Sequence, residues 1–454
     1  MRSAAAATVL LACSLAAPAW AGDVAEREDP TFYLGGIQVN EPDHDRWLDT
    51  VRSVGMNTVA VTVYAMQGDW DTDHLWFEEQ EPAVLDEIRR AKARGLAVVL
   101  ILRVAVDHKF PRNKFIWHGM IMPKSDEAIV SWFDRYREFV VKWARVAEEE
   151  GVDLLGIGSE MNALASTLPI TRWGNFKNYY GFYWYQRMLR KRSLKFADRI
   201  KERHLWVRGY ENYETLEEFL QARFRHNRAW AKQAYLRKES HRFKKINERR
   251  RLLNDQWVRL IEKTRAVYRG KLTYAANFDQ FHEVGFWRHL DRMGINSYFS
   301  LRGNINKELT SEEETKQFTD RWQQIFDGIG RFKSAQGLAQ IPFLFTEIGY
   351  TFRRHSTVEP WAHGGFSVVG WGVKRRQLVV WDEQPVDYEE RQLALSALET
   401  VHRKHRGELT GILYWKLSTL KQHEEIEPFV LHIGPDSTDP LQPTLAEFAE
   451  SGAP

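Results

Sequence analysis

The sequence predicts an α/β protein built on one closed (β/α)8 barrel with a long insertion after the fourth strand. With 454 residues, the chain is long enough for a barrel of about 250 residues that carries insertions. Strand-like and helix-like segments alternate over short connections, a pattern typical of a parallel sheet. Two of the strand-like segments end in a glutamate. Because the carboxyl ends of barrel strands meet at one face, where barrel enzymes place their chemistry, both glutamates are expected there.

The elements follow from residue type and periodicity. Apolar, partly β-branched runs predict buried strands at residues 31–39, 57–64, 96–103, 152–160, 271–277, 292–298, 341–346 and 409–415. Apolar residues at helical spacing predict helices at residues 43–54, 82–94, 131–150, 256–268, 311–333 and 388–404. Ser311 to Glu314 resembles a capping box that opens one of these helices. After the eighth strand we expect irregular chain and a short last helix.

The alternation stops between the fourth and fifth strands, where residues 168–255 are expected to form a helical, basic insertion in a catalytic domain of residues 22–454. Residues 186–253 contain 21 Lys and Arg against 8 Asp and Glu, a net charge of +13, whereas the whole chain carries +3. They include no proline and one glycine, which favours long helices. The charge fits a solvated helix face, or a surface that contacts an anionic polymer or the cell envelope.

Residues 1–21 have the pattern of an export signal. Arg2 precedes an apolar run over residues 4–17, and Ala19-Trp20-Ala21 is a small-x-small cleavage site. We therefore expect a bacterial protein that is cleaved after Ala21 and is periplasmic or secreted, which argues against a nucleic-acid partner. Cys13, the single cysteine, would be lost with the signal. No later segment is apolar enough to be expected to cross a membrane.

The glutamates that end two strands are Glu160, after Leu154 to Ser159, and Glu347, after Leu344 to Thr346. Two carboxylates at one barrel face suggest glycoside hydrolysis, with one as general acid/base and the other as nucleophile. The acid then needs a raised pKa, while the nucleophile stays ionised. Alternatively, each glutamate is a structural residue that pairs with a nearby arginine.

Several segments together resemble glycoside hydrolase family 113, a family of clan A retaining enzymes whose known members are β-1,4-mannanases. The resemblance covers about residues 30–420, without the insertion, and rests on Gly158-Ser159-Glu160, Leu272 to Asn277, Phe286-Trp287, Leu290-Asp291 through Gly294-Ile295 to Tyr298, Phe345 to Tyr350, and Trp117 with Gly119.

The resemblance implies that Glu160 is the general acid/base and Glu347 the nucleophile. It implies further that Tyr298 donates a hydrogen bond to Glu347 and that Trp415 forms the floor under the sugar at the cleavage point. It also implies that Trp117 holds substrate. Asn277 and Arg103 are implied to hold either substrate or Glu347. For Tyr298 and Trp415 the alternative is core packing; for Asn277 and Arg103 it is a structural role at the strand end.

The resulting prediction is an exported, retaining hydrolase of β-linked polysaccharide, most simply β-1,4-mannan, that needs no cofactor. There is no HExxH motif, and the acidic residues 69–73 do not continue as a calcium loop. Two departures from the family concern the substrate: Ser159 stands where much of the clan has asparagine, and Leu102-Arg103-Val104-Ala105 stands where a Lys-Pro-His-like run is expected. Two alternatives stay open, namely a hydrolase of another, anionic exopolysaccharide and a catalytically silent carbohydrate-binding or envelope scaffold protein.

Overall fold

The computed structural model describes residues 30–77, 81–171, 213–234, 243–303, 309–362, 368–369, 378–379 and 384–451. The predicted export signal and parts of the predicted insertion, residues 172–212 and 235–242, lie outside these ranges. Among the described residues, no helix combines the length and apolar character that crossing a bilayer requires. No group of three or more metal-ligating side chains occurs among them either.

The predicted (β/α)8 barrel is confirmed. Eight strands pair in parallel in the order β1-β11-β8-β7-β6-β5-β4-β2, and pairing of β1 with β2 closes the ring. Two short strands, β3 and β12, extend the sheet beyond the ring. The strands are β1 (Tyr33–Gln38), β2 (Thr58–Gln67), β3 (Leu75–Trp76), β4 (Ala97–Val106), β5 (Leu154–Ser159), β6 (Lys271–Asn277), β7 (Met293–Asn296), β8 (Phe343–Ile348), β11 (Leu409–Ser418) and β12 (Leu431–His432). A separate antiparallel pair joins β9 (Val368–Val369) to β10 (Leu378–Val379).

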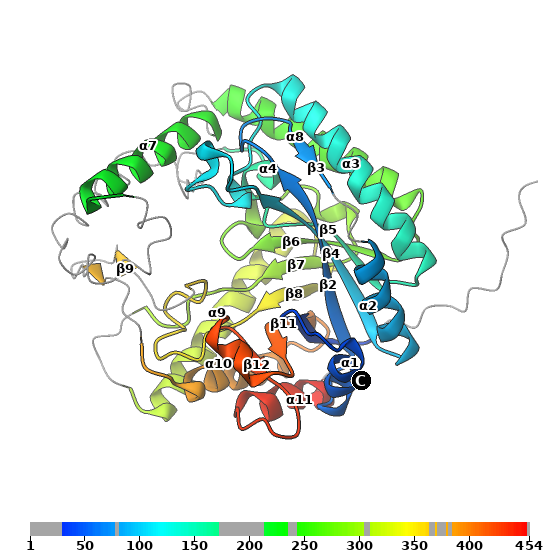
Figure 1. Cartoon of the computed structure of the whole chain (residues 1–454), viewed down its shortest axis with the longest axis vertical. Coiled ribbons are helices and arrows are strands. Elements are labelled where there is room, and N and C mark those ends of the chain that lie inside the picture. The colour runs from blue at the N-terminus through cyan, green and yellow to red at the C-terminus, as the bar shows by residue number, and fades with distance from the viewer. Residues whose placement is uncertain are drawn as a thin grey trace, which may run out of the picture.

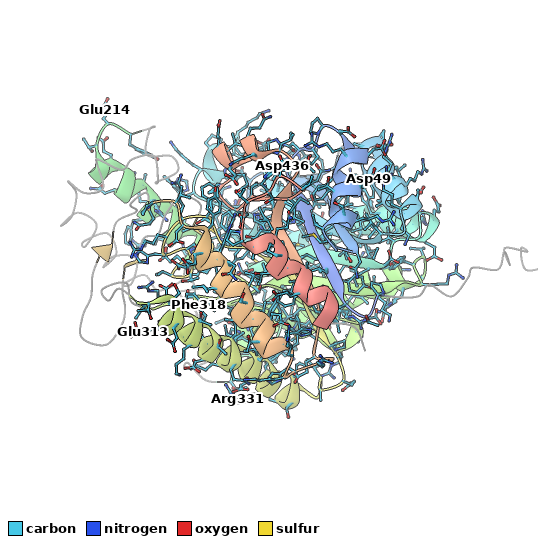
Figure 2. The ribbon with its side chains drawn as sticks, turned by 90° about the horizontal axis from the view of Figure 1, so that it is seen from below. Asp49, Glu214, Glu313, Phe318, Arg331 and Asp436 are labelled. Carbon is cyan, nitrogen blue, oxygen red and sulfur yellow. The ribbon has the colours of Figure 1, made fainter. Side chains whose placement is uncertain are left out.

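Helices surround the barrel and connect its strands (Figure 1). They are α1 (His44–Ser53), α2 (Glu81–Ala93), α3 (Asp126–Glu149), α4 (Asn162–Ala165), α7 (Leu216–Ala234), α8 (Phe243–Arg265), α9 (Ser311–Gln336), α10 (Tyr388–His402) and α11 (Leu441–Ser451). Five 3₁₀ turns complete the description: η1 (Pro111–Asn113), η2 (His118–Met120), η7 (Phe281–Glu283), η8 (Trp287–His289) and η9 (Lys421–Glu425). Seen from below, α9, α10 and α11 lie side by side along one flank of the barrel (Figure 2).

Two apolar layers hold this architecture together. Inside the ring, alternate strand residues such as Tyr33, Ile101 and Leu413 fill the barrel with buried side chains, and Trp415 packs against them. Outside the ring, a much larger cluster joins the strands to the helices, with Trp132 and Trp322 fully buried in it. The barrel is therefore a filled core, and side chains meet substrate only at its ends.

Four local predictions need correction. The third helix begins at Asp126 rather than 131, because Ser125 accepts a hydrogen bond from Ala128 N–H and caps it. The helix predicted at residues 256–268 is the second half of the longer α8. The capping box joins Thr310 to Glu313, one residue earlier than expected. The strands β2, β4 and β11 each end three residues later than predicted, at Gln67, Val106 and Ser418.

Candidate active site

Glu347 lies in β8, at the carboxyl end of the barrel, and is almost fully buried. Its Oε2 accepts a hydrogen bond of 2.8 Å from the hydroxyl of Tyr298. Its Oε1 forms an ion pair with the guanidinium of Arg103, which comes from the end of β4. One donor from β4 and one from the chain just after β7 therefore hold the carboxylate, and Arg103 compensates its charge inside the barrel mouth.

Glu160 directly follows β5 and has a left-handed backbone, with φ of 51°. Such a conformation costs a non-glycine residue about 1 to 3 kcal/mol and is concentrated at functional sites. The neighbouring strand β6 holds this turn in two places. Glu160 N–H donates to Ala275 C=O at 2.8 Å, and Met161 N–H donates to the buried hydroxyl of Tyr274 at 2.9 Å. The strained turn aims the carboxyl toward the loop between β4 and α3.

That loop supplies His118, whose Nε2 lies 3.1 Å from Glu160 Oε2. Burial raises the pKa of Glu160. The opposing effects are the hydrogen bond and charge of His118, the charge of Arg103 and a hydrogen bond from Asn296. Together they are larger than the effect of burial, so the pKa lies below its usual value. This direction is opposite to the raised pKa expected from the sequence for a general acid. The reason is that His118, Arg103 and Asn296, which all lie outside β5, lower the pKa of Glu160.

Asn296, at the end of β7, connects the two glutamates. Its side-chain oxygen accepts a hydrogen bond of 2.8 Å from Thr346, the residue before Glu347. Its amide lies 3.4 Å from the hydroxyl of Ser159, the residue before Glu160, and also reaches the Glu160 carboxyl. One amide therefore fixes the ends of β5 and β8 relative to each other across β7.

Trp415, in β11, lies beside two cations. The guanidinium of Arg103 is 4.9 Å from the centre of the indole ring, and the ammonium of Lys416 is 4.6 Å from it. Lys416 in turn pairs with Glu427 at 2.9 Å. Burial raises the pKa of the nearby Tyr64 hydroxyl. Its pKa is nevertheless below the usual value, because of the charge and hydrogen bond of Arg103, a hydrogen bond with Thr62 and the charge of Lys416. This side of the site therefore has a positive potential.

Asn277 ends β6 next to Asn296 in the strand register. Its side-chain oxygen is buried and has no hydrogen-bond partner among the described residues. Since a buried acceptor without a partner costs free energy, this oxygen is suited to a donor that arrives with substrate. Trp117 is partly buried and its ring meets that of His118 edge-on, with 4.9 Å between the ring centres.

The structure thus brings six of the predicted residues to the carboxyl ends of the strands, and the seventh, Trp117, to the adjoining loop. Sequence analysis overlooked four others in the same place: Tyr64, His118, Asn296 and Lys416. His118 and Lys416 directly follow Trp117 and Trp415, and Asn296 lies two residues before Tyr298. Attention to polar neighbours of the predicted residues would have found these three.

The loop that carries His118 is held from outside by α7. The indole N–H of Trp230, which is buried, donates to Met120 C=O at 2.6 Å, and Gln233 donates to Pro123 C=O at 3.3 Å. Arg249 of α8 donates to Gln233 C=O at 2.9 Å. Helices that follow the fourth barrel strand therefore fix the position of the partner of Glu160.

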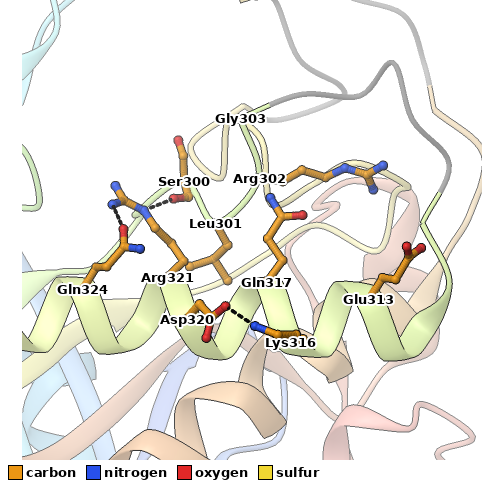
Figure 3. A pocket seen from close by; sticks show the side chains of 10 residues that line it. All are labelled: Ser300, Leu301, Arg302, Gly303, Glu313, Lys316, Gln317, Asp320, Arg321 and Gln324. Carbon is orange, nitrogen blue, oxygen red and sulfur yellow. Dashed lines mark hydrogen bonds and ion pairs between the residues drawn. The ribbon is translucent and has the colours of Figure 1, made fainter.

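A hollow of about 640 Å³ lies elsewhere, between the chain after β7 and the first turns of α9 (Figure 3). Its charged groups are paired nearby, Lys316 with Asp320 at 2.7 Å and Arg321 with Ser300 C=O at 3.1 Å. None of the predicted site residues lines it. The chemistry is therefore assigned to the barrel end that holds Glu160 and Glu347.

Comparison with known proteins identifies the same fold in solved structures. The β-mannanase AaManA of glycoside hydrolase family 113 from Alicyclobacillus acidocaldarius, solved with ManMIm, shares the fold with a TM-score of 0.55 at 14% identity, over 94% of this chain and 99% of that chain. A family 113 β-1,4-mannanase, solved as a complex, matches with a TM-score of 0.54 at 15% identity, over 93% and 99%. A search of curated protein sequences finds no match. The model of Glycoside Hydrolase Family 113 matches residues 37–176 and 245–370, more than half of the chain, and the protein therefore belongs to this family of glycoside hydrolases.

Proposed function

We propose that the protein is a retaining glycoside hydrolase that cleaves a β-linked, manno-configured polysaccharide by double displacement. In the first step Glu347 attacks the anomeric carbon, while Glu160 gives its proton to the departing glycosidic oxygen. In the second step the ionised Glu160 takes a proton from water, and the resulting hydroxide displaces Glu347 from the sugar. The two steps invert the anomeric carbon twice, so the configuration is retained.

One observation carries this proposal: two carboxyls lie at the same end of the barrel and are held by different partners. Glu347 is fixed on both oxygens, by Tyr298 and Arg103, which suits a nucleophile that must stay ionised and aligned. Glu160 is more exposed than Glu347, at 13% against 4%, and lies 3.1 Å from His118 Nε2. A general acid/base must exchange its proton with substrate and water, so it has to be more accessible than the nucleophile.

The substrate class is argued from the related structures and from two residues of the site. The related structures are named as β-mannanases, and the unpaired oxygen of Asn277 and the ring of Trp415 offer a polar and an apolar contact to a sugar. We propose β-1,4-mannan or a polymer with the same sugar configuration. We also propose, from residues 1–21, that the protein acts outside the cytoplasm as a periplasmic or secreted enzyme.

The test is hydrolysis of β-mannan and manno-oligosaccharides by the wild type, Glu347→Ala and Glu160→Gln, with the anomer first released followed by NMR. Glu312→Gln, on the exposed face of α9, is the matched control. We expect retained configuration in the wild type and the control, and loss of cleavage in both site variants. Inverted configuration, or full activity of Glu347→Ala, would refute the mechanism. If the folded wild type cleaves neither substrate, the manno-configured substrate is refuted, and a hydrolase of another polymer or a silent binding protein remains.

A further inference from the structure

Beside the candidate active site, cations and rings gather where the loop after β4 meets α7. We call this group the basic aromatic cluster, and it consists of Arg112, Lys114, Phe115, Tyr213, Arg225 and His226. The ring of Phe115 stacks on Tyr213 with 6.3 Å between centres and meets His226 edge-on at 5.1 Å. The ammonium of Lys114 lies 4.4 Å from the centre of the Tyr213 ring. Two segments that are far apart in sequence thus form one surface.

The cluster concentrates positive charge around neutral rings. Burial lowers the pKa of His226 most, and the charge of Arg225 lowers it further. A hydrogen bond to the Arg112 backbone raises this pKa, whereas the charges of Lys114 and Arg112 lower it. Three cations therefore act on one imidazole. Arg112 is balanced by ion pairs with Asp71 and Asp69. For Lys114 the described contact is the face of an aromatic ring, and Arg225 is exposed on α7.

The cluster lies close to the cleavage point. Lys114 is four residues before His118, so the two Cα atoms are at most about 14 Å apart even in extended chain. Arg225 is on the same helix as Trp230, which binds Met120 C=O in that loop. The cluster and the partner of Glu160 therefore belong to the same loop, held by the same helix.

We propose that the basic aromatic cluster binds carboxylate groups of an acidic polysaccharide, so that the substrate carries uronic acids next to the cleavage point. Aromatic faces contact the apolar face of a sugar, while ammonium and guanidinium groups bind its carboxylate. Gathering like charges at one surface costs stability that an anionic ligand offsets. The inference rests on the proposed function, because it extends the same binding site.

Two polymers test it directly, since polymannuronate and β-1,4-mannan differ only in oxidation of carbon 6 to a carboxylate. Binding is measured by retardation of the whole protein in native gels that contain one polymer or the other, at low and at high salt. The variants are the double substitution Lys114→Ala with Arg225→Ala, and as control Arg259→Ala, an exposed arginine of α8.

We expect polymannuronate to retard the wild type and Arg259→Ala, and salt to weaken the effect. The double variant should bind polymannuronate about tenfold more weakly, since each exposed charge contact contributes little by itself. Equal retardation of the double variant and the wild type overturns the inference, as does binding to β-mannan alone. Turnover is measured separately on manno-oligosaccharides. If the wild type cleaves these but does not bind polymannuronate, the inference about the cluster is overturned and the proposed function stands. Binding without any turnover overturns the proposed function and leaves the cluster as a polyanion site.

Discussion

Replacing His118 tests how the environment of Glu160 sets the pH range of the enzyme. In the free protein the hydrogen bond and charge of His118 lower the pKa of Glu160, second in size only to the opposing effect of burial. The general acid must be protonated at the start of the reaction, so the alkaline limb of kcat/KM follows this pKa. His118→Ala removes the partner and leaves the burial, so the pKa of Glu160 rises. The alkaline limb should therefore move to higher pH.

The size of the shift follows from the contact. A hydrogen bond to a charged group contributes about 1.5 to 3 kcal/mol, and 1.36 kcal/mol corresponds to one pKa unit. The His118 and Glu160 side chains are 28% and 13% exposed, which places the effect near the lower end. Arg103 and Asn296 remain in the variant and continue to lower the pKa. Losing a contact of about 1.5 kcal/mol is enough for a pH profile to resolve, and the alkaline limb should move to higher pH.

The assay is the pH dependence of kcat/KM on a soluble manno-oligosaccharide for the wild type, His118→Ala and His289→Ala. His289 is an exposed histidine of η8 and serves as the control. Thermal unfolding at each pH separates lost activity from lost structure. An alkaline limb that stays in place, or moves to lower pH in His118→Ala, would show that His118 does not control the protonation of Glu160.

Three further changes have defined outcomes. Tyr298→Phe removes the 2.8 Å hydrogen bond to the buried Glu347, so kcat/KM should fall about 10- to 100-fold in steady-state kinetics and stability should fall by about 1 to 3 kcal/mol; an undiminished kcat/KM would contradict the role of the hydroxyl. Trp230→Phe leaves Met120 C=O without its donor, so urea unfolding should show a loss of about 1 to 3 kcal/mol together with a lower kcat; full activity would mean that α7 does not position His118. Burial and the charge of Glu390 raise the pKa of Glu314 to about 7. The folded state therefore binds the Glu314 proton more tightly than the unfolded state does. As a result, the folded state loses stability as pH rises from about 4.5 to 7. Glu314→Gln should remove this loss of about 2 to 3 kcal/mol in urea unfolding at pH 4.5 and 8, and an equal pH dependence in both proteins would contradict it.

Much of the barrel could be predicted because its strands are buried on both faces. Such strands are continuous apolar runs, as in Leu154 to Ile157 or Phe343 to Phe345, and their side chains leave little freedom in where each strand lies. The helix limits were predicted less well. Caps such as Ser125 and Thr310 depend on the local backbone, and several neighbouring residues offer equivalent side chains.

The sequence by itself determined which face of the barrel Glu160 and Glu347 occupy, because a barrel brings the carboxyl ends of its strands together whatever their separation along the chain. It did not determine the exact strand ends, since β8 includes Glu347 and continues to Ile348. Tertiary structure alone decided which groups meet those carboxyls. His118 comes from a loop 42 residues before Glu160, and that loop is held by Trp230, which lies 110 residues after Met120. A pKa is set by distances between charges and by burial, and neither has a local signature in sequence. For this reason the residue type of the acid could be predicted, but not the direction in which its pKa is shifted.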